Sequence, residues 1–481
     1  MAPLKGASGA ETPTGPGMEG DTRGSAGEKG AVFVASVTSF MTPFMGSSVN
    51  IALPAIGKTY AMDAVLMGWV TTSYLIATAV FLLPLGRASD LVGRKRIFVS
   101  GILVFTGVSL CIPLSWSATA LIALRGVQGM GGAMIFGTAM AILASAVAPR
   151  RRGRAIGIAT GATYAGLTAG PFLGGLLTEG LGWQSIFIVC ALAGAAVFVV
   201  AARCVRPDTG APSGGSFDLA GASVYAGALV ALMLGLARVR TASGVTLLVA
   251  GAAAMGVFLL WEGRQACPLV NTALFRSNRA FTWSNAAAFI HYSATFSTSF
   301  LMSLYLQSVR GFGPSGAGVV LVTQPAVMTV LSPLAGRLSD RIEPRILASL
   351  GMVITSVGLA LLASLGQGTE TPWIVSCLGL VGLGFSLFSS PNTNAVMSSV
   401  SPGDYGMASG VLATMRITGQ SFSMAVVLLV ISLFLGDRGT AHVDQEAFMT
   451  AMRTGFVFFS LLGIPGVLAS LARGEVRKRP G

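Results

Sequence analysis

Apolar residues occur along the chain in long blocks that begin at Ala31 and end at Leu471. A block of about 20 residues is enough for a helix to cross a hydrocarbon core of roughly 30 Å. Residues 97–113 and 245–261 show no alternation of apolar and polar positions, which excludes the strands of a barrel. We therefore predict an all-α integral membrane protein with fourteen spans, at residues 31–54, 65–86, 97–115, 119–146, 155–177, 183–203, 219–237, 244–262, 280–307, 316–336, 346–365, 372–398, 406–435 and 453–472.

The composition agrees with a chain that lies mostly in lipid. Of the 481 residues, 53% are hydrophobic and 10% are charged, and the mean hydropathy of +0.74 is far above that of soluble globular proteins. Residues 1–30 are rich in Gly, Pro and Thr and lack the compact apolar core of a secretory signal. We expect this segment to be a disordered cytoplasmic tail. The five cysteines lie singly in or beside spans and are interpreted as packing residues.

The Lys and Arg residues are distributed unevenly between the two sides of the predicted membrane. With the amino terminus inside, only six of the 31 fall in outer loops and two fall within spans. This is the positive-inside pattern, and it accounts for the net charge of +13 without a nucleic-acid partner. We predict a multi-pass protein of the plasma membrane with both termini in the cytoplasm. The six outer residues are Lys58, Arg238, Arg240, Arg310, Arg438 and Arg453.

A repeat divides the chain into two halves. Residues 86–97 read GRASDLVGRKRI after the second span, and residues 336–347 read GRLSDRIEPRIL after the tenth. Parallel six-span halves explain this repeat, and transporters built in this way bind their substrate between the halves near the midplane. We predict a tail at 1–30, an N-terminal half at 31–205, a linker with two inserted spans at 206–279, a C-terminal half at 280–472 and a basic cytoplasmic tail at 473–481.

Four short motifs resemble those of the major facilitator superfamily. Segment 86–97 is similar to its loop signature, and residues 125–129 (RGVQG) to its second signature. Residues 49–54 (VNIALP) resemble the fourteen-span drug:proton antiporter branch. The resemblance covers residues 31–472 and implies alternating access, with one face of span 5 closing the cytoplasmic side against leak. Span 5 carries the full antiporter signature, Gly157, Gly166, Gly170, Pro171, Gly174 and Gly175.

Two of these motifs also have a direct physical interpretation. Small residues on one helical face let two backbones approach closely, so the span 5 glycines predict tight packing, with a kink at the proline. Asp90 can pair with a neighbouring Arg or a helix amino terminus in one conformer and lose that partner in the other. We expect a conformational latch made of Gly86, Asp90, Gly93, Arg94 and, in the second copy, Asp340.

Three ionisable side chains lie within the spans, Arg125, His291 and Arg416. A charge at the midplane costs several kcal/mol unless it is paired or hydrated, so these residues are candidates for function. No Asp or Glu lies in the middle of a span. Relatives with the span 1 motif commonly carry an Asp five residues before Asn50, and here that place is Met45. This departure argues against a cationic substrate.

His291 is the candidate for proton exchange, because histidine titrates at about pH 6.5 whereas arginine stays protonated. It shares a helix face with Thr295 and Ser299, and a packing role against a Ser or a carbonyl is the alternative. Arg125 matches the family's proposed relay residue. The candidate substrate and proton pathway comprises Arg125, His291, Arg416, Asn50, Gln128, Gln324, Asn392 and Gln420.

We predict a secondary active transporter that exports small organic molecules, drugs or metabolites, in exchange for protons. We expect it to act as a monomer in membrane lipid, without a cofactor or a metal. An uncoupled or anion-selective exporter of one metabolite is the alternative, because the charges within the spans are cationic. A membrane-embedded enzyme is disfavoured, since His291 and His442 are far apart and no nucleophile with its base is recognisable.

Overall fold

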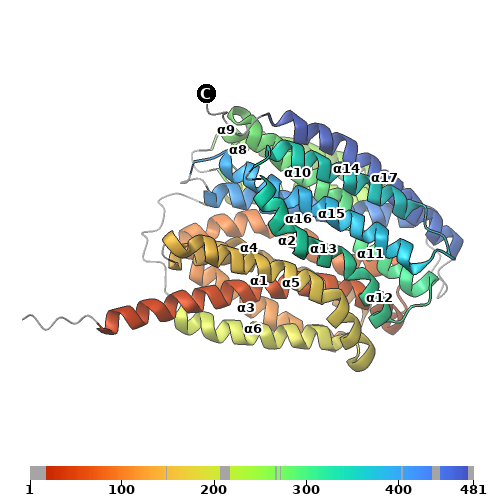
Figure 1. The fold of residues 1–481 in the computed structure, drawn as a ribbon, viewed down its shortest axis with the longest axis horizontal. Coiled ribbons are helices and arrows are strands. Elements are labelled where there is room, and N and C mark those ends of the chain that lie inside the picture. Colours follow the sequence, from red (N-terminus) through yellow and green to blue (C-terminus); the bar gives the residue numbers. More distant parts are fainter. Residues whose placement is uncertain are drawn as a thin grey trace, which may run out of the picture.

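The computed structural model describes residues 18–147, 149–205, 217–265, 268–270, 272–339, 341–401, 405–435 and 445–474. Regular secondary structure in these ranges is helical throughout, which confirms the all-α class. The helices run side by side along the long axis of the molecule (Figure 1). They are α1 (Met18–Tyr60), α2 (Ala64–Val92), α3 (Arg94–Cys111), η1 (Ile112–Leu114), α4 (Ala118–Ala146), α5 (Pro149–Leu181), α6 (Gln184–Cys204), α7 (Leu219–Ala237), α8 (Ala242–Glu262), α9 (Thr272–Ser277), α10 (Arg279–Thr295), α11 (Thr298–Leu304), η2 (Tyr305–Val309), α12 (Pro314–Leu321), α13 (Thr323–Ser339), α14 (Pro344–Ala363), α15 (Thr371–Ser398), α16 (Tyr405–Leu435) and α17 (Gln445–Ala472).

The number of membrane spans differs from the prediction. Twelve stretches of the described residues are helical, long and apolar enough to cross a membrane, so the predicted total of fourteen is not confirmed. Two predicted spans are not among the twelve. Residues 155–177 lie inside α5, and residues 280–307 are divided among α10, α11 and the π-helical η2 because the helix is interrupted at Phe296 and Ser297.

Packing contacts divide the helices into two groups, with a separate pair beside them. In the first group, which we call the N-half (α1–α6), α5 packs along α1, and α2 and α3 pack against α4. In the second, the C-half (α9–α17), α15 packs against α13 and α14, and α17 packs against α10 and α14. Figure 1 shows the red to yellow N-half helices next to the green and blue C-half helices. The pair α7 and α8 attaches through α7 to α2 and α16, one helix of each half.

The two halves meet along two seams. One seam joins α2 to α16, and the other joins α1 and α5 to α11, α12 and α13. Backbones in the second seam approach so closely that a Cβ on Gly318 would collide with the carbonyl of Pro171. We call the end of the bundle with the loops that follow α1 and α5 the outer end, and the opposite end the inner end. The charge distribution predicts that the outer end faces away from the cytoplasm.

A single glycine makes the turn between α2 and α3. Gly93 has φ 109°, a left-handed conformation that side chains rarely adopt. Its amide donates to the carbonyl of Ser89 at 3.0 Å, which ends α2, and α3 begins at the next residue, Arg94. The turn therefore places the loop signature, residues 86–97, across the end of α2 and the start of α3.

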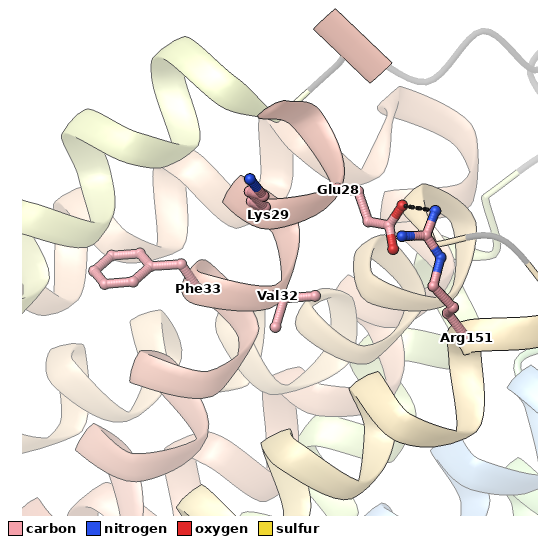
Figure 2. Close-up of a pocket in the computed structure, with 5 residues that line it drawn as sticks. All are labelled: Glu28, Lys29, Val32, Phe33 and Arg151. Carbon is pink, nitrogen blue, oxygen red and sulfur yellow. Dashed lines mark ion pairs between the residues drawn. The ribbon is translucent and has the colours of Figure 1, made fainter. Parts of the chain in front are cut away.

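The first helix starts earlier than the sequence predicts. α1 begins at Met18, inside the segment 1–30 for which we expect a disordered tail, and it projects beyond its neighbours in Figure 1. Glu28 on α1 forms an ion pair of 2.9 Å with Arg151 near the start of α5. Figure 2 shows this pair at a pocket on the inner end, which is also lined by Lys29, Val32 and Phe33.

Candidate functional site

Arg125 on α4 is enclosed within the N-half. Its side chain is only 1% exposed, and its Nε donates to the carbonyl of Val70 on α2 at 3.1 Å. The guanidinium also donates to the side-chain oxygen of Gln128 and lies over the ring of Tyr74, 4.5 Å from its centroid. A carbonyl, an amide and an aromatic face thus stabilise the buried cation without an acidic partner among the described residues.

Gln128 extends this contact to a third helix. Its amide nitrogen donates to the hydroxyl of Ser109 on α3 at 2.7 Å, and Gln128 itself is fully buried. Arg125 and Gln128 therefore lie together, as their spacing on one helix face predicts. Together they connect α2, α3 and α4. The pair holds the N-half together, and in the part of the chain that the structure describes its hydrogen bonds stay within that half.

His291 on α10 faces α15 inside the C-half. Its ring stacks on Phe388 with centroids 4.0 Å apart and planes at 28°, and a second ring, Phe385, lies at 5.1 Å. The residue is 1% exposed, and its Nε2 is buried without a hydrogen-bond partner. This apolar contact favours the neutral imidazole, because a charged ring here would lose its hydration.

Arg416 on α16 differs from Arg125 because its contacts leave part of the guanidinium free. The side chain is half-buried, and its Nη2 donates to the Thr393 hydroxyl on α15 at 2.6 Å. The guanidinium lies 5.5 Å from the ring centroid of Tyr292 on α10. Its Nε is buried and has no acceptor. The expected partner on its own helix, Gln420, is half-buried, and Arg416 donates to α15 in its place.

The remaining polar candidates lie at different places in the bundle. The Asn50 side chain on α1 accepts a hydrogen bond from the Thr71 hydroxyl on α2 at 3.0 Å. Asn392 on α15 donates to the carbonyl of Ser284 at 3.2 Å, and its Oδ1 is buried without a partner. Gln324 on α13 is half-buried. The candidate residues therefore form two groups. The N-half carries Asn50, Arg125 and Gln128, and the C-half carries His291, Gln324, Asn392, Arg416 and Gln420.

The loop signature lies at the inner end of α2 and α3. Asp90 and Arg94 form an exposed ion pair of 3.0 Å across the turn that Gly93 makes. Lys95 donates to the carbonyl of Ala202 near the end of α6 at 3.1 Å, a favourable place for a cation. A Cβ on Gly86 would meet no atom within 4 Å. The second-copy candidate, Asp340, lies outside the described residues.

The span 5 glycines pack in two directions. A Cβ on Gly166 or Gly170 would collide with α1, and one on Gly174 would lie 2.7 Å from the Cα of Ser48. A Cβ on Gly175 would lie 2.6 Å from the carbonyl oxygen of Pro314 in the C-half. The expectation of tight packing fails at Gly157, which has no atom within 4 Å of such a Cβ. Pro171 lies inside α5 between these contacts.

Hydrogen bonds between the halves, which sequence reasoning missed, gather at the outer end. The Ser303 hydroxyl donates to the carbonyl of Asn50 at 2.7 Å, and the Gln307 amide donates to the carbonyl of Ile51 at 3.0 Å. The backbone amide of Ser315 donates to Glu179 at 3.1 Å. Near the middle of the bundle the hydroxyls of Thr168 and Thr329 lie 2.8 Å apart. Small polar residues in apolar helices are common, so the sequence carried no signal for these pairs.

Comparison with known proteins gives one family for this chain. The model of the Major Facilitator Superfamily matches residues 35–424. The multidrug resistance protein Stp of Mycobacterium tuberculosis is 31% identical over 82% of this chain and 74% of its own length. The cephamycin export protein CmcT of Amycolatopsis lactamdurans is 31% identical over 83% of this chain and 84% of its own length.

A solved structure supports the same fold. A bacterial homolog of the human lysosomal transporter Spinster, in an inward-facing and unoccupied conformation, superimposes with a TM-score of 0.68 at 16% identity. The match covers 95% of this chain and 99% of that one.

Proposed function

The chain belongs to the major facilitator superfamily and is a multi-pass secondary transporter rather than an enzyme, and we propose that it exports small organic molecules in exchange for protons. Relatives whose names record drug resistance and antibiotic export support the direction of transport. We also propose that it works as a monomer in the plasma membrane, with both termini in the cytoplasm.

The observation that carries this proposal is the placement of the contacts between the halves. Among the described residues, hydrogen bonds that join the N-half to the C-half lie at the outer end or near the middle. Such contacts close the outer end. Each uses one hydroxyl, one amide or one carboxylate, so water can replace the partner when the halves rock apart. This arrangement supports alternating access between an inward-facing and an outward-facing state.

Proton coupling requires a group that can gain and lose a proton during the cycle. We propose His291, because a histidine ordinarily titrates nearer to neutral pH than any other side chain and the Nε2 of His291 has no partner in this conformation. The ring is packed against Phe388 within the C-half, so proton exchange also requires this contact to loosen during the cycle. One proton crossing about 100 mV and about one pH unit releases about 3.7 kcal/mol, enough for a substrate gradient of several hundredfold.

An uncoupled exporter is a second candidate because one specific feature favours it. Arg125 and Arg416 are cations within helices that carry no acidic partner for them among the described residues. A fixed positive field attracts an anionic metabolite, and the membrane potential, negative inside, then drives the anion outward without a proton.

The test uses inside-out membrane vesicles that contain the protein. An imposed pH gradient, acidic inside the vesicle, should drive uptake of at least one dye from a panel of cationic, neutral and anionic aromatic dyes. Collapsing the gradient with nigericin should stop that uptake. Uptake that persists after collapse supports the uncoupled exporter. If vesicles with the protein take up no dye beyond vesicles without it, the exporter proposal is contradicted.

A further inference from the structure

We propose that Arg416, Thr393 and Tyr292 form a subsite that binds the acidic group of an aromatic substrate. This inference rests on the proposed export function and names the substrate class that it serves, an aromatic carboxylate or phenolate. The three residues come from α16, α15 and α10 and are all half-buried.

The first argument is that the guanidinium of Arg416 is incompletely satisfied. One nitrogen donates to the Thr393 hydroxyl at 2.6 Å, while the buried Nε has no acceptor. A buried donor without a partner costs about 1–3 kcal/mol, and more when it is charged. Nε and the neighbouring Nη form the edge that a carboxylate grips with both oxygens. A planar acid would supply the missing acceptor.

The second argument comes from comparison with the other arginines. Arg125 also lies within a span, yet its Nε reaches the carbonyl of Val70 and the rest of its guanidinium meets Gln128 and Tyr74. Arg87 and Arg473 also have an unpaired nitrogen, but they lie at the inner ends of α2 and α17, away from the middle of a span. Arg416, by contrast, lies in the middle third of α16.

The third argument is the position of the subsite relative to both halves. The helix that carries Arg416, α16, packs against α2 of the N-half, and Ile417, the next residue, packs against a buried cluster that includes Ile76 and Ala79 on α2. The subsite therefore lies where N-half and C-half meet, which is where the two halves exchange access.

The fourth argument identifies the rest of the substrate. Phe289, one turn before Tyr292 on α10, packs against Phe422 on α16 with ring centroids 5.8 Å apart, and both side chains are half-buried. These rings come from the same two helices as Tyr292 and Arg416, and the Tyr292 ring lies 5.5 Å from the guanidinium. An aromatic ring system that carries an acidic group matches both parts, because the ring packs on aromatic faces while the acid pairs with the cation.

The positive charge of Arg416 also disfavours a cationic ligand. No ion pair to Arg416 occurs in the ranges that the structure describes, and Met45 on α1 is a core residue with 1% exposure. A cationic dye would meet an uncompensated positive charge. The subsite should therefore separate molecules of the same ring system by their charge.

The experiment compares two xanthene dyes, the anionic fluorescein and the cationic rhodamine 123, by fluorescence polarisation on purified protein in detergent at neutral pH. Arg416→Gln should weaken fluorescein binding roughly ten- to hundredfold. Arg416→Lys should retain an intermediate affinity, because it keeps the charge but not the planar fork. Thr393→Val should weaken fluorescein binding less. Rhodamine 123 binding should stay equal or improve in all three variants.

Three results would overturn the subsite. These are equal fluorescein affinity for wild type and Arg416→Gln, no fluorescein binding to wild type, or a parallel loss of both dyes in well-folded variants. If Arg416→Gln does not fold, the same comparison is made with Arg416→Lys and Thr393→Val. Because binding is measured without a gradient, failure of the subsite is distinct from failure of proton-driven export.

Discussion

Glu179 on α5 accepts two hydrogen bonds from Ser315 at the start of α12, one from the backbone amide at 3.1 Å and one from the hydroxyl. The contact joins the N-half to the C-half at the outer end. Gly175, one turn earlier on α5, approaches the backbone of Pro314 beside it, so hydrogen bonding and close packing act at one place. An exporter must break this contact whenever its outer end opens.

The outer contact should depend on pH. Its hydrogen bonds from Ser315 hold the pKa of the Glu179 carboxyl below its ordinary value of 4.5. Ionised Glu179 therefore favours the closed outer end, an effect fully present above that ordinary value and lost as the pH falls through the lowered pKa. Spin labels on the outer ends of α5 and α12 should show the closed distance at neutral pH and a longer one in strong acid.

Glu179→Gln should lengthen the distance between these labels at neutral pH and remove its dependence on pH. The matched control is Glu370→Gln, which changes another exposed carboxylate before α15 and should leave the distances unchanged. A pH profile of Glu179→Gln identical to that of wild type would show that Glu179 does not hold the outer end closed.

Gly170→Val should damage the transporter, whereas Gly157→Val should be tolerated. A Cβ at position 170 would collide with the Ser47 hydroxyl and lie 3.1 Å from the carbonyl oxygen of Phe44, while none meets an atom within 4 Å at position 157. Overpacking typically costs about 1–3 kcal/mol. Thermal unfolding in detergent and proton leak in vesicles measure the effect. If the two variants unfold at the same temperature and leak protons equally, the close packing at Gly170 is not important for the transporter.

Asp90→Asn should slow transport with little loss of folded protein. The ion pair of Asp90 with Arg94 is exposed on both sides, and such pairs contribute about 0–1 kcal/mol to stability. Lys95→Gln should be milder, because Lys95 only caps the end of α6. Initial transport rates at matched amounts of membrane protein test this order. Wild-type rates for Asp90→Asn would exclude a latch at this residue.

His291→Gln should bind substrate yet lose the dependence of flux on an imposed pH gradient. Glutamine keeps a polar side chain beside Phe388 but does not titrate near neutral pH. Thr295→Val, which removes a hydroxyl that donates to the His291 carbonyl, is the control for disturbance of α10 and should keep coupling. If His291→Gln transports with the pH profile of wild type, His291 is a packing residue and protons pass elsewhere.

Several properties of this protein followed from the sequence because they depend on length, composition and short spacing. Blocks of about 20 apolar residues require helices in a bilayer, where every backbone group must be satisfied within the segment. Arg125 and Gln128, three residues apart, meet on one helix face, as any helix brings such neighbours together. The motif resemblance likewise led to the family that the comparison confirms.

The tertiary structure decided what neighbouring helices do to these side chains. Arg125 and Arg416 have the same sequence signal, a cation within a span near an amide, yet Val70 satisfies the first and the second keeps an unpaired Nε. Gly170 and Gly157 belong to one motif, and only the former touches α1. The physical reason is that the rotation of each helix about its own axis is set by packing against helices that are distant in sequence. A one-residue change in that rotation turns a side chain by about 100°, and the sequence of one helix does not specify it.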